Sequence, residues 1–410
     1  MPEGPATVPR GAWRALAALG VAMLLGMATW FSAGAVVPQL TAEFDLGSSQ
    51  VAWLTIGVQF GFVIGALALA LTSTADRIGP RQLIAMGAIG AGAVNLSLLF
   101  VGAGWQVIAA RILTGVCLAG VYPPGMKAIS TWFPHSRATA VAVLIGALTL
   151  GSAAPHLVAA VGGLDWTFVV IGTSVLSAVS GVVAIGIVRD GPHPFPASGP
   201  FRLGAAARAF SRPRVLLTSL GYFGHMWELY AMWSWFAVFF AHVLSGHGSV
   251  PAWVGSLVTF LVIGIGALGC LVGGRMAERL GSARVAILSM WISGACALVI
   301  GWLADGPVWL VVVVALVWGF WIIPDSPQFS ALITHVADQR LVGSVLTLQL
   351  ALGYIVTIPI VWLVPLVSDR VGWGPTFTLL ALGPMLGILA MRRLRTSLAG
   401  TEHEPVNARR

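Results

Sequence analysis

Hydrophobic residues in this chain occur in long runs separated by short polar stretches. A helix needs about 20 mostly apolar residues to cross the hydrocarbon core of a bilayer. Twelve runs have roughly this length, at 13–38, 51–74, 82–101, 105–131, 137–161, 165–188, 215–244, 250–274, 283–303, 307–334, 341–367 and 374–391. The pattern predicts an all-α integral membrane protein with twelve transmembrane helices.

The composition supports a membrane protein. Of the 410 residues, 58% are hydrophobic and 9% are charged, whereas soluble domains have about 25% charged residues. The first apolar run lacks a small-residue cleavage site after a short apolar core, so we interpret it as a retained span and not as a signal peptide.

The basic residues predict the orientation of the chain in the membrane. If the N-terminus is cytoplasmic, the arginines outside the spans fall inside the cell, with the exception of Arg370, and the outer loops carry Glu43, Asp45, Asp165, Asp305 and Asp369. Cytoplasmic loops are enriched in Lys and Arg. We therefore expect a multi-pass protein of the cell membrane with both termini in the cytoplasm. The net charge of +8 is then explained by contact with anionic lipid, and no nucleic-acid partner is needed.

A Pro-, Gly- and Arg-rich stretch divides six predicted spans from six. We predict an N-terminal six-helix bundle at 1–188, a cytoplasmic linker at 189–214 with a short surface helix near 202–211, a C-terminal six-helix bundle at 215–391, and a cytoplasmic tail at 392–410.

The two bundles repeat the same landmarks, which predicts a pseudo-symmetric pair. ADRIGPR (75–81) follows the second span and AERLGSAR (277–284) follows the eighth, so that Asp76, Arg77 and Gly79 correspond to Glu278, Arg279 and Gly281 with a shift of 202 positions. YPPGMK (122–127) in the fourth span corresponds to IPDSPQ (323–328) in the tenth. We expect helix interruptions at Tyr122–Gly125 and at Pro324–Pro327.

These residues carry a resemblance to the major facilitator superfamily, which extends over essentially the whole chain. The first-half loop matches the family signature G-x-x-x-D-R-x-G-x-R at Asp76, Arg77, Gly79 and Arg81, with Thr72 in place of the leading glycine and Gly274 at the equivalent place in the second half. Arg111 and Gly115 are similar to the family's pattern in the fourth helix. The resemblance implies transport by alternating access between two halves.

The repeated loop residues are candidates for a cytoplasmic gate. The arginines can pair with carboxylates or with helix C-terminal carbonyls across the two halves. The candidates are Asp76, Arg77, Gly79 and Arg81, with Glu278, Arg279 and Gly281 in the second half. The alternative is a loop that only directs membrane insertion.

Ionisable residues inside the spans are the main functional candidates. An ionised side chain at the bilayer centre costs roughly 2.5–3.5 kcal/mol on insertion scales, so it needs a wet cavity or a partner. Glu228 lies about 20 Å along its helix from Val215 and shares a face with Tyr222, His225 and Met232. We predict that this face is interior and that Glu228 binds and releases a proton. A static ion pair is the alternative.

The remaining candidates are polar or aromatic residues of other spans. Arg111 is predicted to hold an anionic substrate or to tune a carboxylate, and Asp325 to bind an ion or substrate or only to stabilise a restarted half-helix. We include His156, Gln59, Gln349, Tyr354 and Trp30 as further candidates for the pathway of substrate or protons.

The motifs that are missing limit the function classes. The sequence has no GxxxxGK[ST], HExxH or GxSxG motif and no Cys/His cluster, so we expect no enzyme, no cofactor and no metal. We predict a monomeric secondary active transporter for a small organic anion or zwitterion, coupled to protons. The alternatives are a drug/proton antiporter that exports lipophilic compounds, and a membrane sensor or scaffold that does not transport.

Overall fold

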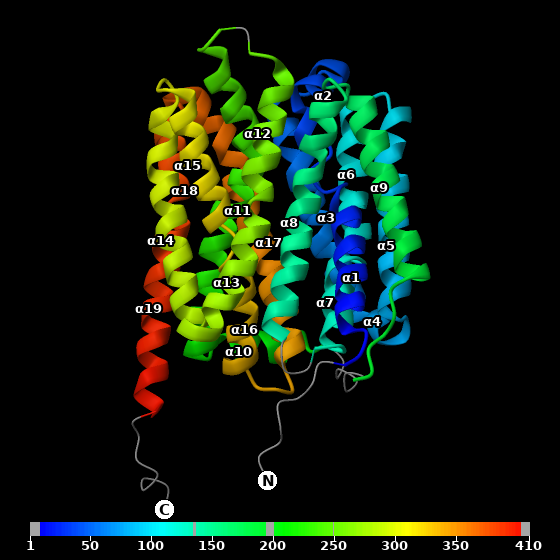
Figure 1. Cartoon of the computed structure of the whole chain (residues 1–410), viewed down its shortest axis with the longest axis vertical. Coiled ribbons are helices and arrows are strands. Elements are labelled where there is room, and N and C mark those ends of the chain that lie inside the picture. The colour runs from blue at the N-terminus through cyan, green and yellow to red at the C-terminus, as the bar shows by residue number, and fades with distance from the viewer. Residues whose placement is uncertain (1–8, 134–136, 194–200, 249, 403–410) are drawn as a thin grey trace, which may run out of the picture.

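The computed structural model describes residues 9–133, 137–193, 201–248 and 250–402. Within these ranges the chain is helical, with no β-strand, and the long helices run side by side (Figure 1). The predicted all-α membrane fold is confirmed. In the described residues, ten helical segments are long and apolar enough to cross a membrane.

The helices of the first half follow the predicted spans. They are α1 (Ala12–Met27), η1 (Gly34–Val36), α2 (Val37–Phe44), α3 (Ser48–Leu71), α4 (Thr74–Arg77), α5 (Pro80–Leu96), η2 (Ser97–Phe100), α6 (Gly104–Leu118), α7 (Tyr122–Ser130), α8 (Arg137–Val161) and α9 (Trp166–Gly186). The carboxylate of Asp165 caps α9 and accepts hydrogen bonds from the hydroxyl and the backbone N–H of Thr167. These hydrogen bonds lower the pKa of Asp165.

The second half begins after a short surface helix. The elements are α10 (Leu203–Phe210), α11 (Pro213–Ser245), α12 (Ala252–Gly264), α13 (Gly266–Leu280), α14 (Ser282–Ile300), η3 (Gly301–Leu303), α15 (Val308–Trp321), α16 (Ser326–Val336), α17 (Val342–Val371), α18 (Trp373–Leu380) and α19 (Leu382–Glu402). The expected linker helix near 202–211 is α10. The predicted spans outside the ten apolar segments, 13–38 and 215–244, correspond to α1 with η1 and to α11.

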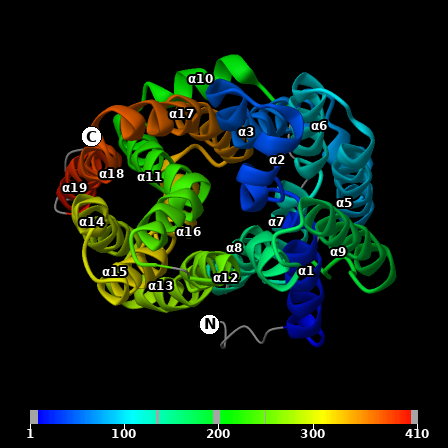
Figure 2. The same ribbon diagram turned by 90° about the horizontal axis from the view of Figure 1, so that it is seen from above.

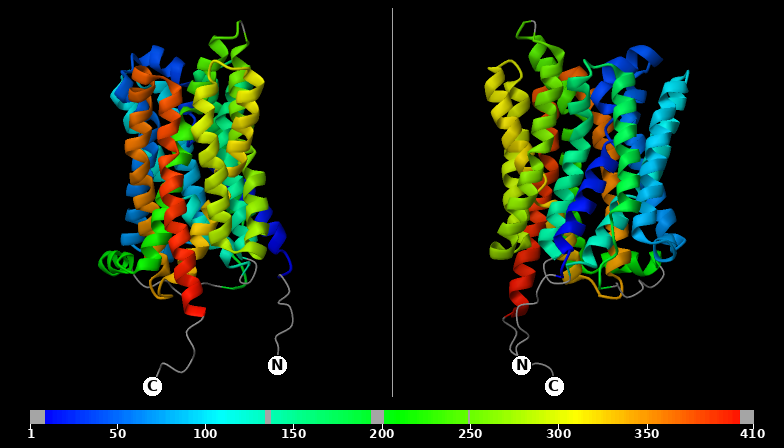
Figure 3. Two further views of the ribbon diagram at one scale, coloured as in Figure 1. Left: turned by 90° about the vertical axis from the view of Figure 1, so that its left-hand side faces the viewer. Right: turned by 45° about the vertical axis from the view of Figure 1, so that its right-hand side comes forward.

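The two halves meet along two seams. Seen from above, α1–α9 form one group and α11–α19 the other (Figure 2), with α3 packed against α17 and α8 packed against α12 and α13. The start of α1 and the end of α19 lie at the same end of the molecule (Figure 3).

Glycines allow the helices within each half to approach closely. A Cβ atom at Gly61 of α3 would collide with the carbonyl oxygen of Ile112, and one at Gly115 of α6 would collide with that of Val58. Small residues at such crossings bring backbones together where lipid provides no hydrophobic driving force between helices. The close packing at Gly61 and Gly115 therefore joins α3 and α6.

Three spans have interruptions of three or more residues between their helical segments. The fourth is broken at 119–121 and the tenth at 322–325, just before the prolines that lie in the first turns of α7 and α16. The expected positions were a few residues too late, because proline is well tolerated in the first turn of a restarted helix and does not have to form the break. The first span is also broken, at 28–33, a position that no feature of the sequence pattern indicates.

Candidate functional site

Aromatic side chains from both halves meet at the contact between them. We call Trp30, Phe31, Phe62, Tyr230, Trp233 and Tyr354 the interface cluster. The ring of Trp30 lies 5.2 Å from that of Phe62, 6.1 Å from that of Tyr230 and 5.5 Å from that of Tyr354, measured between centroids. Phe31 lies 5.9 Å from Trp233, and the hydroxyls of Tyr230 and Tyr354 are 2.8 Å apart. Each member is at most 5% exposed, so the cluster is buried between the halves.

Polar groups beside these rings also join the halves. The Thr357 hydroxyl of α17 lies 2.8 Å from Gln59 Oε1 of α3 and 2.6 Å from the Tyr354 carbonyl, so these two acceptors compete for its single hydrogen. In the part of the chain that the structure describes, Trp30 Nε1, Trp233 Nε1 and Gln59 Nε2 have no hydrogen-bond partner. All three atoms are donors. Buried polar groups normally have a partner, so these donors are unsatisfied groups at the contact between the halves.

Arg111 lies in the first half and is completely buried. Its five N–H groups donate to the carbonyls of Leu54 (3.2 Å), Thr29 (3.0 Å) and Trp30 (2.5 Å), to Ser32 Oγ (3.0 Å) and to Asn95 Oδ1 (3.0 Å). A guanidinium has five N–H donors, so none remains for a substrate. Thr29 and Trp30 lie in the break of the first span. Arg111 donates the hydrogen bonds that their carbonyls would receive from backbone N–H groups in a continuous helix.

Asn95 of α5 extends this network. It accepts from Ser32 Oγ at 2.6 Å and donates to the Val170 carbonyl, Thr173 Oγ1 and Ser174 Oγ of α9. The network thus ties α5, α6 and α9 to the broken first span. It holds Trp30, a member of the interface cluster, in place.

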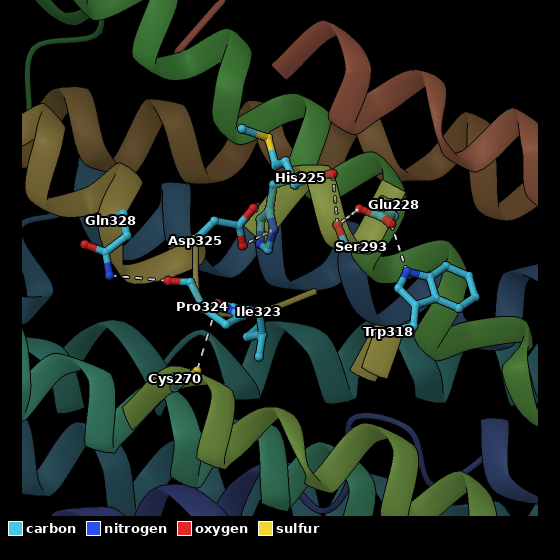
Figure 4. Close-up of polar contacts among 10 residues, drawn as sticks. His225, Glu228, Cys270, Ser293, Trp318, Ile323, Pro324, Asp325 and Gln328 are labelled. Atoms are coloured by element: carbon cyan, nitrogen blue, oxygen red, sulfur yellow. Dashed lines mark hydrogen bonds and ion pairs between the residues drawn. The ribbon is translucent and has the colours of Figure 1, made fainter. Parts of the chain in front are cut away.

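Glu228 and His225 of α11 lie in the second half, each 1% exposed. Glu228 Oε1 accepts from Trp318 Nε1 of α15 at 2.8 Å, and Oε2 accepts from Ser293 Oγ of α14 at 2.8 Å. His225 Nδ1 lies 2.9 Å from Asp325 Oδ1. Figure 4 shows His225 beside Asp325, and Glu228 between Ser293 and Trp318. The two residues therefore have separate partners and do not pair with each other.

The partners of α11 flank the break in the tenth span. Trp318 belongs to α15 before the break, and Asp325 is the last residue of the break, directly before α16, so Glu228 and His225 contact the two sides of the interruption. Within the break, Gln328 Nε2 donates to the Pro324 carbonyl at 3.3 Å and the Cys270 thiol faces the Ile323 carbonyl at 4.0 Å (Figure 4). The state of the Glu228 carboxyl can thus affect the geometry of this interruption.

The predicted interior face of α11 is buried, as expected, but it does not form one surface. Tyr222 packs against Phe329 with centroids 5.9 Å apart, whereas Glu228 is directed toward α14 and α15, which pack against other helices of the second half. Trp318 was not a sequence candidate, because a tryptophan in an apolar run is most often a packing or interfacial residue.

The candidate gate residues differ between the two halves. Glu278 Oε1 accepts from the Thr139 hydroxyl of α8 at 2.8 Å, a contact across the halves. Arg77, Arg81 and Arg279 are exposed, and the side chain of Asp76 lies outside the described residues. Gly281 has φ 84°, a conformation that favours glycine, whereas its counterpart Gly79 has φ −61°.

Two further sequence candidates are buried and unpaired in the described ranges. Neither ring nitrogen of His156 has a hydrogen-bond partner, and neither does Gln349 Nε2. Among the described residues, no group of three or more His, Cys, Asp or Glu side chains is arranged to hold a metal.

An open recess of about 550 Å³ lies in the second half, between α11, η3, α17 and α18. It is lined by His242, Trp302, Asp305, Asp369 and Trp373, among others. None of the sequence-predicted site residues lines it, so it is separate from the interface cluster.

Comparisons with known proteins agree with this architecture. The family model of the Major Facilitator Superfamily matches residues 19–358. The multidrug efflux pump LfrA of Mycolicibacterium smegmatis is 30% identical over 147 residues, which are 35% of this chain and 29% of that protein. The MFS-type transporter pytF of Aspergillus terreus is 26% identical over 181 residues, 43% of this chain and 58% of that protein.

The fold is also found in a solved structure. A crystal structure of the nucleoside transporter NupG matches with a TM-score of 0.70 at 14% identity, covering 93% of this chain and 99% of that one. The curated relatives are matched over less than two thirds of their own length, so their activities as whole proteins do not transfer directly.

Proposed function

This chain belongs to the major facilitator superfamily, and we propose that it is a proton-coupled secondary active transporter of a small solute. Its family makes it a multi-pass membrane transporter and not an enzyme. The observation that carries the coupling proposal is Glu228, a carboxyl at 1% exposure that is held by two donors from neighbouring helices.

The interface cluster is the proposed solute site. It contains residues of both halves, and rocking of one half against the other would take it apart on one side of the membrane at a time. Ligand sites of transporters with repeated halves lie at the interface between the repeats. The buried donors Trp30 Nε1, Trp233 Nε1 and Gln59 Nε2 would bind the solute there.

Glu228 is the proposed proton-binding group. When it is ionised, it accepts hydrogen bonds from Trp318 and Ser293 at full strength; when it is protonated, one oxygen becomes a donor and these bonds must rearrange. Three other titratable groups lie near Glu228. They are Cys296 of α14, His225 of α11 and Asp325 of the tenth span. Trp318 lies in the last turn of α15, just before the break in the tenth span. Proton binding by Glu228 would therefore be transmitted to this interruption between α15 and α16.

The structure changes the preferred class of substrate. The sequence favoured an organic anion or zwitterion because the spans contain a mixed set of charged residues that includes Arg111, but every N–H of Arg111 is used within the first half. The alternative, export of lipophilic compounds, has more support. It agrees with the aromatic interface cluster and with the name of the relative LfrA, a multidrug efflux pump.

The membrane orientation remains the one proposed from the arginines. Both termini would be cytoplasmic, with the N-terminal half at 1–188, the linker at 189–214, the C-terminal half at 215–391 and the tail at 392–410. Glu278, which contacts Thr139 across the halves, would then lie at the cytoplasmic entrance together with Arg77, Arg81 and Arg279.

The proposal is tested with the purified full-length protein. A library of metabolites and drugs is first screened by thermal shift at two pH values. Compounds that stabilise the protein are then added to proteoliposomes that contain a pH-sensitive dye. Proton-coupled transport predicts a proton flux that depends on the compound. Stabilisation without any flux of compound or protons would instead indicate a sensor or scaffold.

The His225–Asp325 pair gives a separate prediction. We expect His225→Gln and Asp325→Asn each to lower the melting temperature and slow transport, because removing one member of a buried ion pair leaves the other unpaired, at a cost of about 3–5 kcal/mol. The double variant should lose little more than either single one, since partners in contact are not additive. A double-mutant cycle on melting temperature measures this, and additive losses would show that the two residues act independently.

A further inference from the structure

We propose that the interface cluster selects uncharged, planar aromatic solutes that carry hydrogen-bond acceptors, and that it discriminates against both organic cations and organic anions. This inference rests on the proposed function and specifies the substrate class of the same site. It follows from three properties of the cluster: its unpaired atoms, its walls and its charges.

The unpaired atoms are all donors. The indole N–H groups of Trp30 and Trp233 and the amide nitrogen of Gln59 have no partner among the described residues, and the three side chains are at most 2% exposed. Leaving a buried donor unpaired costs free energy, so a solute that brings acceptors is favoured over one that brings donors.

The walls are aromatic and come from both halves. Trp30 and Phe62 belong to the first half of the chain, and Tyr230 and Tyr354 belong to the second half. Their rings pack against one another with centroid distances of 4.9–6.1 Å. Offset and tilted ring contacts occur at such distances. A planar aromatic solute can replace these mutual contacts with contacts to itself.

The charges near the cluster do not match an ionic solute. The acidic residues Glu43, Asp45 and Asp165 of the first half lie at helix ends or between helices. In the second half, Glu228 is directed toward α14 and α15, and Asp325 faces His225. Among the described residues, an organic cation therefore has no carboxylate partner at the cluster, which matters because burying an unpaired charge is costly.

Arg111, the buried cation beside the cluster, is not available to an anion either. Arg111 donates to the backbone of Trp30, next to the cluster, but all its N–H groups are used. Its positive charge further disfavours a cationic solute. The interface cluster therefore has hydrogen-bond donors without an exposed ionic group.

The test is equilibrium dialysis of four bicyclic probes against the full chain in lipid nanodiscs, with empty nanodiscs as the blank for partition into lipid. Coumarin is uncharged and has acceptors but no donor; coumarin-3-carboxylate is an anion; N-methylquinolinium is a cation; naphthalene has the rings without acceptors. We expect coumarin to bind at least about fivefold more tightly than the other three, as one or two added hydrogen bonds imply. Equal or tighter binding of any of the others overturns the inference.

Variants connect the selectivity to the named donors. Trp30→Phe and Trp233→Phe keep a ring and remove the N–H, so each should weaken coumarin binding about fivefold and leave naphthalene binding unchanged. Trp227→Phe is the matched control, because the Trp227 indole already donates to the Leu379 carbonyl. Unchanged coumarin affinity in both test variants would show that the donors bind water or nothing, and would overturn the proposal.

Dialysis separates this inference from the proposed function, because it needs no ion gradient. Selective binding of coumarin without any proton flux in proteoliposomes would contradict proton-coupled transport and leave the selectivity intact. Proton-coupled flux of an organic cation or anion that competes with coumarin would support the proposed function and contradict the selectivity.

Discussion

Replacement of Glu228 by glutamine is expected to abolish accumulation driven by a proton gradient while exchange of solute across the membrane continues. Glutamine has the shape of the protonated acid and can still accept from Trp318 or Ser293, but it cannot release a proton. Coupling free energies typically correspond to factors of 5–150. Gradient-driven accumulation in proteoliposomes should therefore fall by at least about tenfold, with counterflow largely preserved.

The control for this experiment is Asp305→Asn, which neutralises an exposed carboxylate in the same half, beside the recess that is separate from the interface cluster. It should accumulate solute at a rate close to that of the unmodified protein. If Glu228→Gln retained accumulation with an unchanged dependence on pH, the carboxyl of Glu228 would have no part in coupling.

Replacement of Arg111 by lysine is expected to impair the protein for every solute, whatever the charge of that solute. An ammonium group has three donors where the guanidinium uses five, so buried acceptors among the Thr29, Trp30 and Leu54 carbonyls lose their partner. Each unsatisfied buried group costs about 1–3 kcal/mol. We expect the melting temperature to fall by at least about 5 °C, and transport to fall because the broken first span is no longer held.

The control is Arg284→Lys, an exposed arginine at the start of α14, which should behave like the unmodified protein. The comparison also decides the role of Arg111. A selective loss of anionic solutes in Arg111→Lys, with normal melting temperature, would restore the interpretation of Arg111 as an anion-binding residue.

The sequence predicts the architecture well because transmembrane helices must be long and apolar and must satisfy their own backbone. The repeated loop and the paired proline segments also have local signatures, and the breaks of the fourth and tenth spans lie within a few residues of the expected positions. The break at 28–33 has no proline within it, and its carbonyls are satisfied by Arg111 from another helix. A single sequence gives no direct sign of such a long-range contact.

The candidate site is only partly predictable for a related reason. The depth of Glu228 and the face it shares with His225 follow from helix geometry, and the structure buries both. The sequence does not say which neighbour each residue meets: Glu228 is held by Ser293 and Trp318, and His225 meets Asp325. The role of Arg111 changed most, because a buried guanidinium looks the same in the sequence whether its partners are backbone carbonyls or a substrate.

The central claim is that protonation of Glu228 shifts the balance between two arrangements of the halves. It is tested most directly by double electron–electron resonance of spin labels placed on both halves, in nanodiscs, as the pH is varied. One pair of labels replaces the exposed Arg14 and Arg284, and the other replaces the exposed Ser49 and Ala252 at the opposite end. We expect two distances for each pair of labels in the unmodified protein, with populations that change with pH in opposite directions at the two ends. In the Glu228→Gln variant, we expect the low-pH distribution at every pH. Populations that titrate equally in that variant, or a single distance at every pH, would contradict it.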